Sequence, residues 1–321
     1  MNREGKVLVL GGNGMVGSAI FHKLVQAGYT NILKPSRAEL DLLSHTDVVQ
    51  YFHRNEFDEI YLAAAKVGGI KANNQYPAEF LIENLLIQNN VIQSAYASDV
   101  KKLLFLGSSC IYPKYATQPI SESSLMSGAL EPTNEAYAVA KIAGIKLIQF
   151  YAKQYGVDFR SIMPCNLYGP NDNFNLENSH VIPALIRKIH LAKLGADESV
   201  TVWGTGNVRR EFLHVSDMAE SCLHVMNLTS DEFERVAGEA RFINVGLGKD
   251  ITIAELVTIL VDIIKYQGRI IFDSSMPDGT PRKLMDNSKV TALGWKPKTS
   301  LNAGLDDTYS WYLKNIAEIR L

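Results

Sequence analysis

Residues 6–17 read KVLVLGGNGMVG, a short apolar run that leads into a glycine-rich loop. A run of this length that ends in glycine predicts a buried parallel strand at Lys6–Leu10. Gly11, Gly14 and Gly17 form the pattern G-x-x-G-x-x-G. Glycine allows a sharp turn and lets the backbone come close to a pyrophosphate, which then lies on the N-terminus of the next helix. The stretch therefore predicts a dinucleotide-binding loop; the alternative is a glycine-rich turn without a ligand.

The chain after this loop continues as alternating helices and strands. Met15–Ala27 carries apolar side chains at helical spacing and ends at Gly28, a favourable helix stop. Further strands are expected at Asn31–Leu33, Glu59–Ala64, Lys102–Gly107 and Asp158–Met163, and helices at Asp47–Arg54, Pro77–Ser98 and Glu135–Gln154. This alternation predicts an α/β fold with a doubly wound, parallel Rossmann sheet.

The second half of the chain has a different composition. Asn166–Ser179 is rich in Asn, Gly and Pro and is predicted to be a long loop, a kind of segment that is usually functional in a compact domain. Helices are expected at Val181–Ala192, Ser216–Asn227 and Ile253–Ile264, with short strands between them. We expect residues 1–165 to form a cofactor-binding domain with a return segment near 215–247, including a strand around Phe242–Val245. Residues 166–321 would mainly form a smaller, discontinuous α/β substrate domain.

The overall composition excludes several classes of protein. The 321 residues are 46% hydrophobic and 21% charged, which is ordinary globular composition. The net charge of −2 gives no reason to expect binding to nucleic acid or to an anionic membrane. Cys110, Cys165 and Cys222 cannot all pair and lack zinc-like spacing, so we expect no metal and a reducing, cytoplasmic setting. We expect neither a signal peptide nor a membrane-spanning helix, because no apolar run approaches the roughly 20 residues that a span requires.

The residues after the second strand indicate which dinucleotide is bound. An Asp or Glu at this place would bind the ribose 2′-hydroxyl of NAD. The chain instead reads Lys34-Pro35-Ser36-Arg37. A guanidinium matches a 2′-phosphate in shape and charge, so Arg37 favours NADP(H); a solvated surface arginine is the alternative. Asp41 is expected to lie near the adenine.

Tyr137 and Lys141 form a Tyr-x-x-x-Lys spacing on a predicted helix, where residues four apart share a face. An ammonium near a phenol lowers the pKa of the phenol. A shift of the tyrosine pKa from about 10 to about 7 requires roughly 4 kcal/mol, which Lys141 and a nicotinamide cation together could supply. The tyrosine would then exchange a proton with an oxygen while hydride moves at the same carbon. An exposed helical pair without a function is the alternative.

Ser108 follows the fourth predicted strand, in the segment GSSCIYP (Gly107–Pro113). The carboxyl ends of parallel strands are where such sheets bind ligands. A serine hydroxyl at this position can form a hydrogen bond with the reacting oxygen beside Tyr137. Ser108 and Ser109 could equally form a turn or a helix cap.

The order of glycine loop, serine and Tyr-x-x-x-Lys resembles the extended short-chain dehydrogenase/reductase family, and within it the GDP-L-fucose synthases. Motifs along nearly the whole chain carry this resemblance. They are AAAKVGGI (Ala63–Ile70), GSSCIYP (Gly107–Pro113), EPTNEAYAVAKIAGIK (Glu131–Lys146), MPCNLYGP (Met163–Pro170), DNFNLENSHVIP (Asp172–Pro183), VWGTGNVRREFLHV (Val202–Val215) and PDGTPRK (Pro277–Lys283).

The resemblance implies that Cys110 and His180 are an acid/base pair for epimerisation. A 4-keto group acidifies the protons on C3 and C5 of a sugar. Inversion of each centre requires proton removal on one face and return on the other, and Cys and His have pKa values close enough to neutrality for both tasks. Without the motif match, a buried packing cysteine and a loop histidine would be the simpler interpretations. Cys165 and Cys222 are expected to be packing residues.

The resemblance also implies the binding residues for NADP(H) and for a GDP-sugar. The cofactor residues would be Gly11, Gly14, Met15, Val16, Gly17, Arg37, Asp41, Ala64, Leu106, Lys141, Pro164, Leu167 and His180. The substrate residues would be Asn166, Lys188, Trp203, Arg210, Asp278 and Lys283. Arg and Lys suit a diphosphate, although Lys188 stands where the family pattern offers Arg and so lacks a bidentate contact. Solvated surface charge is the alternative for these basic residues.

The activity implied is the NADPH-dependent conversion of GDP-4-keto-6-deoxy-D-mannose to GDP-L-fucose, by epimerisation at C3 and C5 followed by reduction of the 4-keto group. The alternative is another nucleotide-sugar epimerase/reductase, such as a GDP-colitose synthase. A 4,6-dehydratase is disfavoured, because those enzymes have Thr-Asp/Glu-Glu where this chain has Ser108-Ser109-Cys110. A 4-epimerase would not require Cys110 with His180, and a non-catalytic regulator on the same fold would not require Tyr137 with Lys141. By the same resemblance, Pro77–Ser98 and Glu135–Gln154 are expected to form a homodimer interface.

Overall fold

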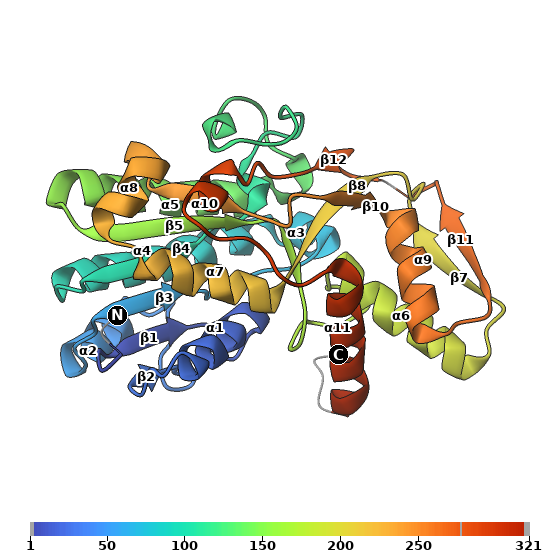
Figure 1. The fold of residues 1–321 in the computed structure, drawn as a ribbon, viewed down its shortest axis with the longest axis horizontal. Helices are drawn as coiled ribbons and strands as arrows, with labels where there is room; N and C mark the ends of the chain where they lie inside the picture. Colours follow the sequence, from blue (N-terminus) through green and yellow to red (C-terminus); the bar gives the residue numbers. More distant parts are fainter. Residues whose placement is uncertain (1–2, 277, 318–321) are drawn as a thin grey trace.

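The computed structural model describes residues 3–276 and 278–317 of the chain (Figure 1). Pro277, the first residue of the motif PDGTPRK, lies outside the described residues. The large sheet has six strands in the order β2-β1-β3-β4-β5-β9, all of them parallel. They are β2 (Ile32–Leu33), β1 (Val7–Leu10), β3 (Glu59–Leu62), β4 (Lys102–Leu106), β5 (Asp158–Pro164) and β9 (Phe242–Val245). The predicted α/β class with a parallel Rossmann sheet is confirmed.

Helices cover both faces of this sheet. Helices α2 (His45–Arg54), α4 (Pro77–Ala97) and α5 (Glu135–Tyr155) pack in succession, whereas α1 (Met15–Gln26) packs against α7 (Val215–Asn227). The strands are apolar and buried because both of their faces are covered, as in β1, where all four residues are buried. The predicted strands and helices of the first half are observed, with shifts of one or two residues at their ends.

The order of the strands creates a crevice. From β1 the chain passes to β2 on one side, and it returns to β3 on the other side of β1. Ligands of doubly wound sheets bind at such a switch point, outside the carboxyl ends of the strands. The loops that follow β1, β3, β4 and β5 therefore meet at one edge of the sheet, and these loops contain the predicted glycines, Ser108 and Cys110.

A second, smaller unit lies to the right of the large sheet in Figure 1. Strand β8 (Arg209–His214) pairs with β6, β10 and β12, while β7 and β11 form a separate pair. The remaining bounds are β6 (Asn166–Tyr168), β7 (Ser199–Trp203), β10 (Asp250–Thr252), β11 (Arg269–Asp273), β12 (Arg282–Lys283), α6 (Val181–Gly195), α9 (Ile253–Ile264) and α11 (Leu301–Asn315). The apolar faces of α6, α9 and α11 form a hydrophobic cluster separate from that of the large sheet.

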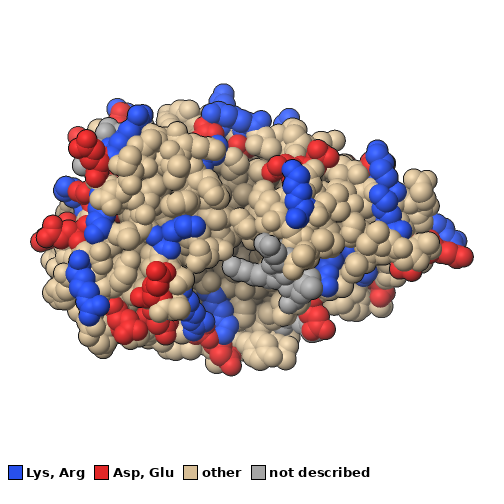
Figure 2. Space-filling view, turned by 90° about the horizontal axis from the view of Figure 1, so that it is seen from below, with Lys and Arg blue, Asp and Glu red and all other residues tan. Residues whose placement is uncertain are grey.

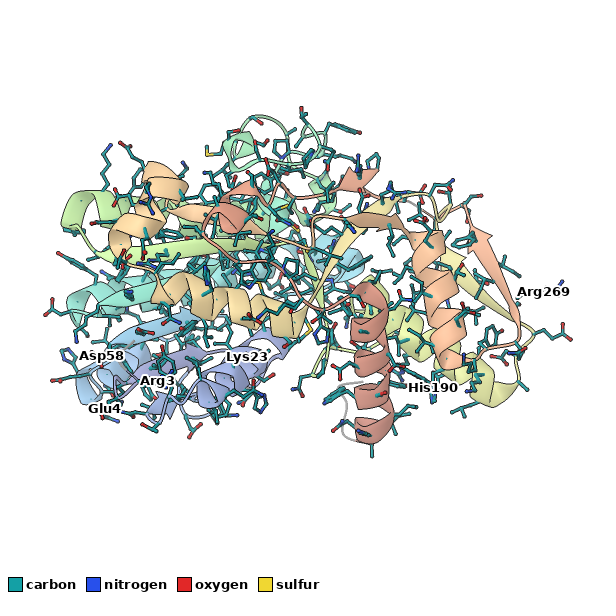
Figure 3. The ribbon with its side chains drawn as sticks, in the orientation of Figure 1. Arg3, Glu4, Lys23, Asp58, His190 and Arg269 are labelled. Carbon is teal, nitrogen blue, oxygen red and sulfur yellow. The ribbon has the colours of Figure 1, made fainter. Side chains whose placement is uncertain are left out.

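His190 shows how polar groups are accommodated in this second cluster. Its side chain is buried between α6 and α11 (Figure 3), and Nδ1 lies 3.0 Å from the hydroxyl of Tyr309. Burial lowers the pKa of the imidazole. His190 is therefore a neutral core residue whose polar atom has a partner.

The structure corrects one prediction and adds elements to others. The segment Asn166–Ser179 was predicted to be all loop, but its first three residues form β6, which pairs in parallel with β8. The pairing provides hydrogen-bond partners for the backbone of these residues, and this stabilises a strand despite the loop-like local composition. Four α-helices in the described part of the chain were not predicted, namely α3 (Ile70–Gln75), α8 (Ser230–Ala237), α10 (Ser288–Ala292) and α11 (Leu301–Asn315).

The chain returns to the large sheet more than once. Strand β9 is the edge strand beside β5, and α10 packs against it. Met285, Val290 and Trp295 belong to the hydrophobic cluster of the large sheet, although they come late in the sequence. The smaller unit is therefore built from several separate segments of chain.

The surface carries charges of both signs. On the face shown in Figure 2, Lys/Arg and Asp/Glu side chains are interspersed, and the molecule is hollowed near the middle of this face. None of the helices in the described part of the chain has the length and apolar character that a membrane span requires.

Candidate active site

The glycine loop after β1 forms an open cradle at the start of α1. Gly14 is the N-cap residue and has no side chain with which to cap the helix, and the first turn of α1 contains no acidic side chain. The backbone N–H groups of Met15, Val16 and Gly17 consequently lack helical acceptors. Such a helix N-terminus attracts an anion through these donors and through the helix dipole.

The three positions of the motif are occupied by glycine for different structural reasons. Gly11 has a φ of +83°, and a Cβ there would lie 2.8 Å from the backbone nitrogen of Ala64. A Cβ on Gly17 would lie 2.1 Å from the carbonyl oxygen of Gly11, so a side chain would push α1 off the loop. A Cβ on Gly14 would approach only that same oxygen, at 3.4 Å, and would otherwise point into open space. The space in front of Gly14 is therefore where the pyrophosphate of a dinucleotide fits.

Arg37 and Asp41 lie together beyond β2. The Arg37 side chain is 77% exposed, and its Nε lies 4.0 Å from Oδ1 of Asp41. Asp41 also accepts a hydrogen bond of 3.1 Å from the backbone N–H of Leu43. The long, exposed pair leaves the guanidinium with donors for an additional anion, so Arg37 fits the predicted 2′-phosphate contact.

The other predicted cofactor residues lie at the carboxyl ends of the neighbouring strands. Ala64 follows β3 and abuts Gly11, while Leu106 ends β4 and Pro164 ends β5. Leu167 is the middle residue of β6. They therefore border the same edge of the sheet as the cradle.

Ser108, Tyr137 and Lys141 come together above the end of β4. Tyr137 lies in the first turn of α5 and shares a hydrogen bond with the Ser108 side chain. Lys141 follows one turn later, is 3% exposed, and donates a hydrogen bond of 2.8 Å to the carbonyl oxygen of Leu106. Its Nζ lies 5.9 Å from the centre of the Tyr137 ring. The spacing on the helix therefore places the hydroxyl pair and the lysine in one pocket.

The electrostatics of this pair differ from the prediction. Burial raises the pKa of Tyr137, the nearby Cys110 raises it further, and the hydrogen bond from Ser108 opposes them. Burial lowers the pKa of Lys141 to about 7. Each charged form loses hydration that its surroundings do not replace, so desolvation sets the direction of both pKa shifts. The lowering of the tyrosine pKa, expected from Lys141 together with a nicotinamide cation, is therefore not produced by the protein alone.

Cys110 lies in a short 3-10 helix, η1 (Ser109–Ile111), directly after Ser108. Its backbone N–H donates to the Ser108 hydroxyl at 3.2 Å. Its Sγ accepts a hydrogen bond of 3.3 Å from Nδ2 of Asn134, and Nζ of Lys283 lies 3.9 Å away. This thiol is partly exposed, whereas Cys165 and Cys222 are buried, as expected of packing residues.

His180 is the N-cap residue of α6. Its side chain reaches solvent, yet the surrounding protein desolvates the imidazole and lowers its pKa, which makes the ring neutral at pH 7. The loop after β3 packs against the residues that precede His180, because the backbone N–H of Gly69 donates a hydrogen bond of 3.1 Å to the carbonyl of Asn178.

The same loop also lies next to a ring that contacts the tyrosine. A Cβ on Gly68 would lie 3.1 Å from the Phe80 ring, and that ring meets the ring of Tyr137 edge to face, with 6.5 Å between the centroids. The loop therefore meets the segment before His180 at Gly69 and the neighbour of Tyr137 at Gly68.

The predicted substrate residues form two groups. Arg210 is close enough to Asp278 and Cys110 for their charges to act on it, while burial lowers its pKa. Asp278 accepts hydrogen bonds from the backbone N–H and the hydroxyl of Thr205, at 2.8 and 2.9 Å. Lys283 beside Cys110 completes the first group.

The second group lies on β7 and α6. Lys188 donates to the carbonyl oxygen of Thr201, two residues before Trp203, whose side chain is 60% exposed at the end of β7. Burial lowers the pKa of Lys188. Asn166 lies beside β8, the strand of Arg210, and its Nδ2 donates a hydrogen bond of 2.9 Å to the carbonyl of Glu211.

Comparison with known proteins assigns the chain to a family. The family model described as "NAD dependent epimerase/dehydratase family" matches residues 7–246, from the first strand to the edge strand of the large sheet. The chain belongs to this family. It is 54% identical to GDP-L-fucose synthase 1 of Arabidopsis thaliana, over 98% of this chain and 95% of that protein. It is 53% identical to GDP-L-fucose synthase of Escherichia coli (strain K12), over 97% of both.

A solved structure agrees with this membership of the epimerase/dehydratase family. MlghC, a GDP-mannoheptose C4 reductase from Campylobacter jejuni with NADP bound, matches with a TM-score of 0.90 and 36% identity, over 98% of this chain and 99% of that chain. The family match ends at residue 246, so Asp278 and Lys283 lie beyond it.

Two residues of this family member escaped the sequence analysis. Asn134 contacts the thiol of Cys110, and the available signal was its position inside the motif EPTNEAYAVAKIAGIK. Glu211 is fully buried, and burial raises the pKa of its carboxyl to about 7. It accepts hydrogen bonds from the backbone N–H groups of Gly248 (2.6 Å) and Met285 (2.9 Å). The sequence signal for Glu211 was its position in the stretch RREFLH, where a carboxyl stands between two basic residues and two apolar ones.

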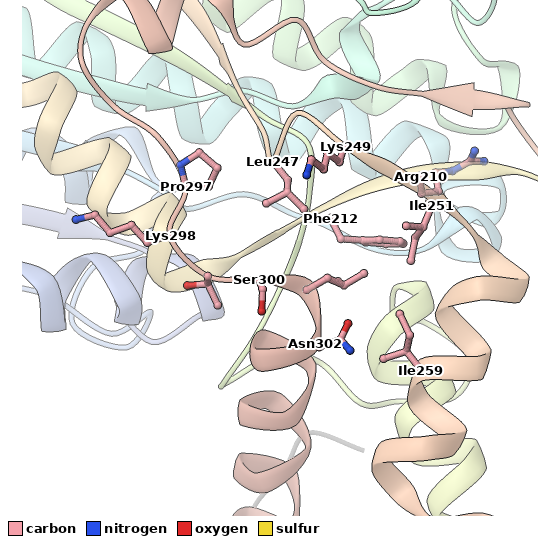
Figure 4. A pocket seen from close by; sticks show the side chains of 12 residues that line it. Arg210, Phe212, Leu247, Lys249, Ile251, Ile259, Pro297, Lys298, Ser300 and Asn302 are labelled. Carbon is pink, nitrogen blue, oxygen red and sulfur yellow. The ribbon is translucent and has the colours of Figure 1, made fainter.

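A separate groove lies between β8, β10, α9 and the start of α11 (Figure 4). Phe212, Ile251, Ile259 and Leu301 line it together with Lys249. The guanidinium of Arg210 points away from this groove in Figure 4, and its charge interacts with Cys110 and Asp278. Neither Tyr137 nor Lys141 lines this groove.

Proposed function

We propose that the protein converts GDP-4-keto-6-deoxy-D-mannose into GDP-L-fucose with NADPH, by epimerising C3 and C5 and then reducing the 4-keto group. The observation that carries this proposal is the thiol of Cys110 next to the Ser108–Tyr137 pair. A simple keto-reductase uses the two hydroxyls and does not need the thiol. The full-length similarity to GDP-L-fucose synthases supports the choice of substrate.

The cofactor in this proposal is NADP(H), as in the solved relative with NADP bound. The uncapped N-terminus of α1 would hold the pyrophosphate, and Arg37 would contact the 2′-phosphate. Asp41 would lie near the adenine. When bound, NADPH supplies the hydride that reduces the carbonyl carbon. Residues 1–165, with the segment near 215–247, would form the cofactor domain.

Cys110 and His180 would perform the epimerisation. The 4-keto group stabilises the carbanion formed at C3 or C5 as an enolate. One of the two residues removes the proton on one face, and the other returns a proton on the opposite face. The lowered pKa of His180 leaves a neutral imidazole that can accept a proton, and Cys110 can act as thiol or thiolate.

Tyr137 would then donate a proton to the O4 oxygen. Its raised pKa keeps the phenol protonated until negative charge develops on the substrate oxygen. The Ser108 hydroxyl, which already bonds the phenol, would hold the same oxygen in place. Lys141, one helical turn away, would supply positive charge when the phenolate forms.

The GDP-sugar would be bound mainly by residues 166–321. Arg210 and Lys283 offer cations for the diphosphate, and both lie near Cys110. Lys188 and the exposed Trp203 would contact the nucleoside end, where the indole can stack on the base or the ribose. Asn166 and Asp278 would provide polar contacts to the ligand.

One experiment tests the proposal. Purified protein is incubated with GDP-4-keto-6-deoxy-D-mannose and NADPH in D2O, and the product is identified by NMR. We expect GDP-L-fucose with deuterium at C3 and C5. GDP-colitose synthase is the alternative function, but a curated GDP-L-colitose synthase of Yersinia pseudotuberculosis is more distant, at 38% identity. Failure to turn over this substrate would contradict the proposal.

The proposal includes a homodimer in the cytoplasm. Ile82 and Leu86 on α4, and Val139 and Phe150 on α5, are exposed apolar side chains on two helices that pack together. Such exposed apolar surface is suited to an interface. The three cysteines are all free, which fits a reducing compartment. Light scattering would show a dimer mass, and charge substitutions at Leu86 and Val139 would shift it to the monomer.

A further inference from the structure

We propose that Asn134 is a positioning residue for Cys110, whose amide holds the thiolate ready for proton transfer at C3 and C5. This inference rests on the proposed epimerisation. The contact is direct, since Nδ2 of Asn134 donates to Sγ of Cys110 at 3.3 Å, within the range of a hydrogen bond to sulfur. The two residues come from different elements, because Cys110 is in η1 and Asn134 directly precedes α5, which packs against η1.

The side chain of Asn134 is not used to cap its helix. Asn134 occupies the N-cap position of α5, where asparagine usually accepts a hydrogen bond from a backbone N–H of the first turn. The side chain of Asn134 makes no such bond. Its amide points to the thiol instead, so a residue type that normally stabilises the helix end serves the neighbouring cysteine here.

The oxygen of the same amide is also unusual. Oδ1 of Asn134 is buried and has no hydrogen-bond partner within the described part of the chain. Most buried polar atoms in proteins have a partner, and a catalytic role or a bound water is among the explanations for one that has none. The Asn134 amide could therefore serve two partners. Its N–H donates to the thiolate of Cys110, and its free oxygen can accept a hydrogen bond from the protonated thiol or from a sugar hydroxyl.

The chemistry requires Cys110 to change its charge. As a base, the thiolate takes a proton from C3 or C5, which leaves a neutral thiol and an enolate. As an acid, the thiol gives the proton back to carbon and becomes a thiolate. A donated N–H bond stabilises the charged form of the sulfur more than the neutral form. The loss of this bond should therefore impair proton removal by Cys110, mainly at low and neutral pH.

The charged groups around Cys110 include two cations, and the carboxylates of Asp278 and Glu131 act on one of these cations, Arg210. Lys283 on β12 and Arg210 on β8 are cationic neighbours of Cys110. Tyr137 on α5 has a raised pKa and is uncharged, and the Ser108 hydroxyl binds the backbone of Cys110. Because both cations remain when the amide is removed, we expect the Cys110 thiolate to lose only part of its stabilisation.

The test uses the full-length protein with Asn134→Ser, since serine is a good N-cap residue but its side chain is too short to reach the thiol. The first measurement is the rate of Cys110 alkylation by iodoacetamide as a function of pH, with Cys110→Ala as the blank. We expect the midpoint to rise by about one pH unit, which corresponds to a tenfold lower thiolate fraction below it. The second measurement is deuterium exchange at C3 and C5, which should fall about tenfold at neutral pH and recover at higher pH.

Two further variants make the result decisive. Asn134→Asp keeps the shape of the side chain and should raise the alkylation midpoint further, because a carboxylate opposes a thiolate. Glu135→Gln changes the next, exposed residue of the same turn and should leave both measurements unchanged. An unchanged midpoint in both Asn134 variants, or an exchange loss equal at every pH, would overturn the inference. If the wild type shows no exchange, the proposed function fails, while the alkylation profile still tests the Asn134–Cys110 contact.

Discussion

The buried ammonium of Lys141 donates a hydrogen bond of 2.8 Å to the carbonyl oxygen of Leu106, the last residue of β4. This contact fixes the lysine at the carboxyl end of a central strand, beside the ring of Tyr137. The loss of hydration outweighs this hydrogen bond and the contact with the Phe105 ring at 4.6 Å, so burial lowers the pKa of Lys141 to about 7. The lysine therefore changes charge near physiological pH, which has consequences for stability.

The first prediction concerns pH-dependent stability without cofactor. The unfolded lysine keeps its proton up to about pH 10.4, whereas the folded one loses it near pH 7, so stability should rise with pH between these values. Each pH unit in this window contributes at most about 1.4 kcal/mol. Urea unfolding at pH 7 and pH 9 should show this rise in the wild type relative to Lys141→Met. Parallel curves for the two proteins would contradict the lowered pKa.

The second prediction separates reduction from epimerisation. Tyr137→Phe removes the proton donor, so NADPH oxidation by the keto-sugar should fall by about 10²–10⁴-fold. Deuterium exchange at C3 and C5 should continue, because it depends on Cys110 and His180. Tyr155→Phe, on the exposed end of the same helix, is the matched control. Loss of exchange in Tyr137→Phe, with both ligands still bound, would refute this division of labour.

The third prediction concerns the thiol. Cys110→Ala should abolish exchange at C3 and C5, while the Ser108–Tyr137 pair can still reduce the substrate ketone that has not been epimerised. NMR of the product should then show a sugar that retains the original configuration at both centres. Normal formation of GDP-L-fucose by this variant would remove Cys110 from the mechanism.

The fourth prediction concerns the selection of the dinucleotide. Arg37→Ala should weaken NADPH binding by about 10–100-fold, the range expected when a hydrogen bond to a charged group is lost, and should leave NADH binding nearly unchanged. Arg54→Ala removes another exposed arginine, at the end of α2, and serves as the control. Titration of both cofactors by fluorescence gives the comparison. Equal losses for NADPH and NADH would show that Arg37 does not read the 2′-phosphate.

The fifth prediction distinguishes two glycines of one motif. Gly17→Ala places a Cβ 2.1 Å from a backbone oxygen, so it should lower the free energy of unfolding by at least about 1–3 kcal/mol. Gly14→Ala meets only ordinary contacts in the protein and should change stability by less than about 1 kcal/mol. The Gly14 variant should nevertheless bind NADPH poorly, because its methyl group enters the cradle. Thermal unfolding with and without NADPH tests both statements.

Local patterns were sufficient to predict most of the large sheet. The apolar run at β1, the helical spacing of α1 and the stop at Gly28 depend on neighbours in the sequence, and all three appear in the structure. The strand β6 was missed because its three residues are extended only through pairing with β8. Pairing partners that are distant in the sequence leave no local signature.

The residues of the candidate site were predictable as types but not in their electrostatics. The spacing of Tyr137 and Lys141 correctly placed them in one pocket, yet the direction of the tyrosine pKa depends on burial, which a helical spacing does not reveal. Asn134 was overlooked for a similar reason. Its contact with Cys110 joins two elements that are distant along the chain, and an asparagine before a helix is ordinarily explained as a cap.

The late return of the chain to the large sheet also determines when the nucleotide-binding half can fold during synthesis. The edge strand β9 and the core residues Val290 and Trp295 complete a hydrophobic cluster that begins with β1. During synthesis, β5 lacks its neighbouring strand until β9 has been made, and the apolar surface that Val290 and Trp295 cover stays exposed until these residues have been made. Truncation before Trp295, even where it spares every residue near the glycine loop, should yield an aggregating fragment that cannot fold by itself.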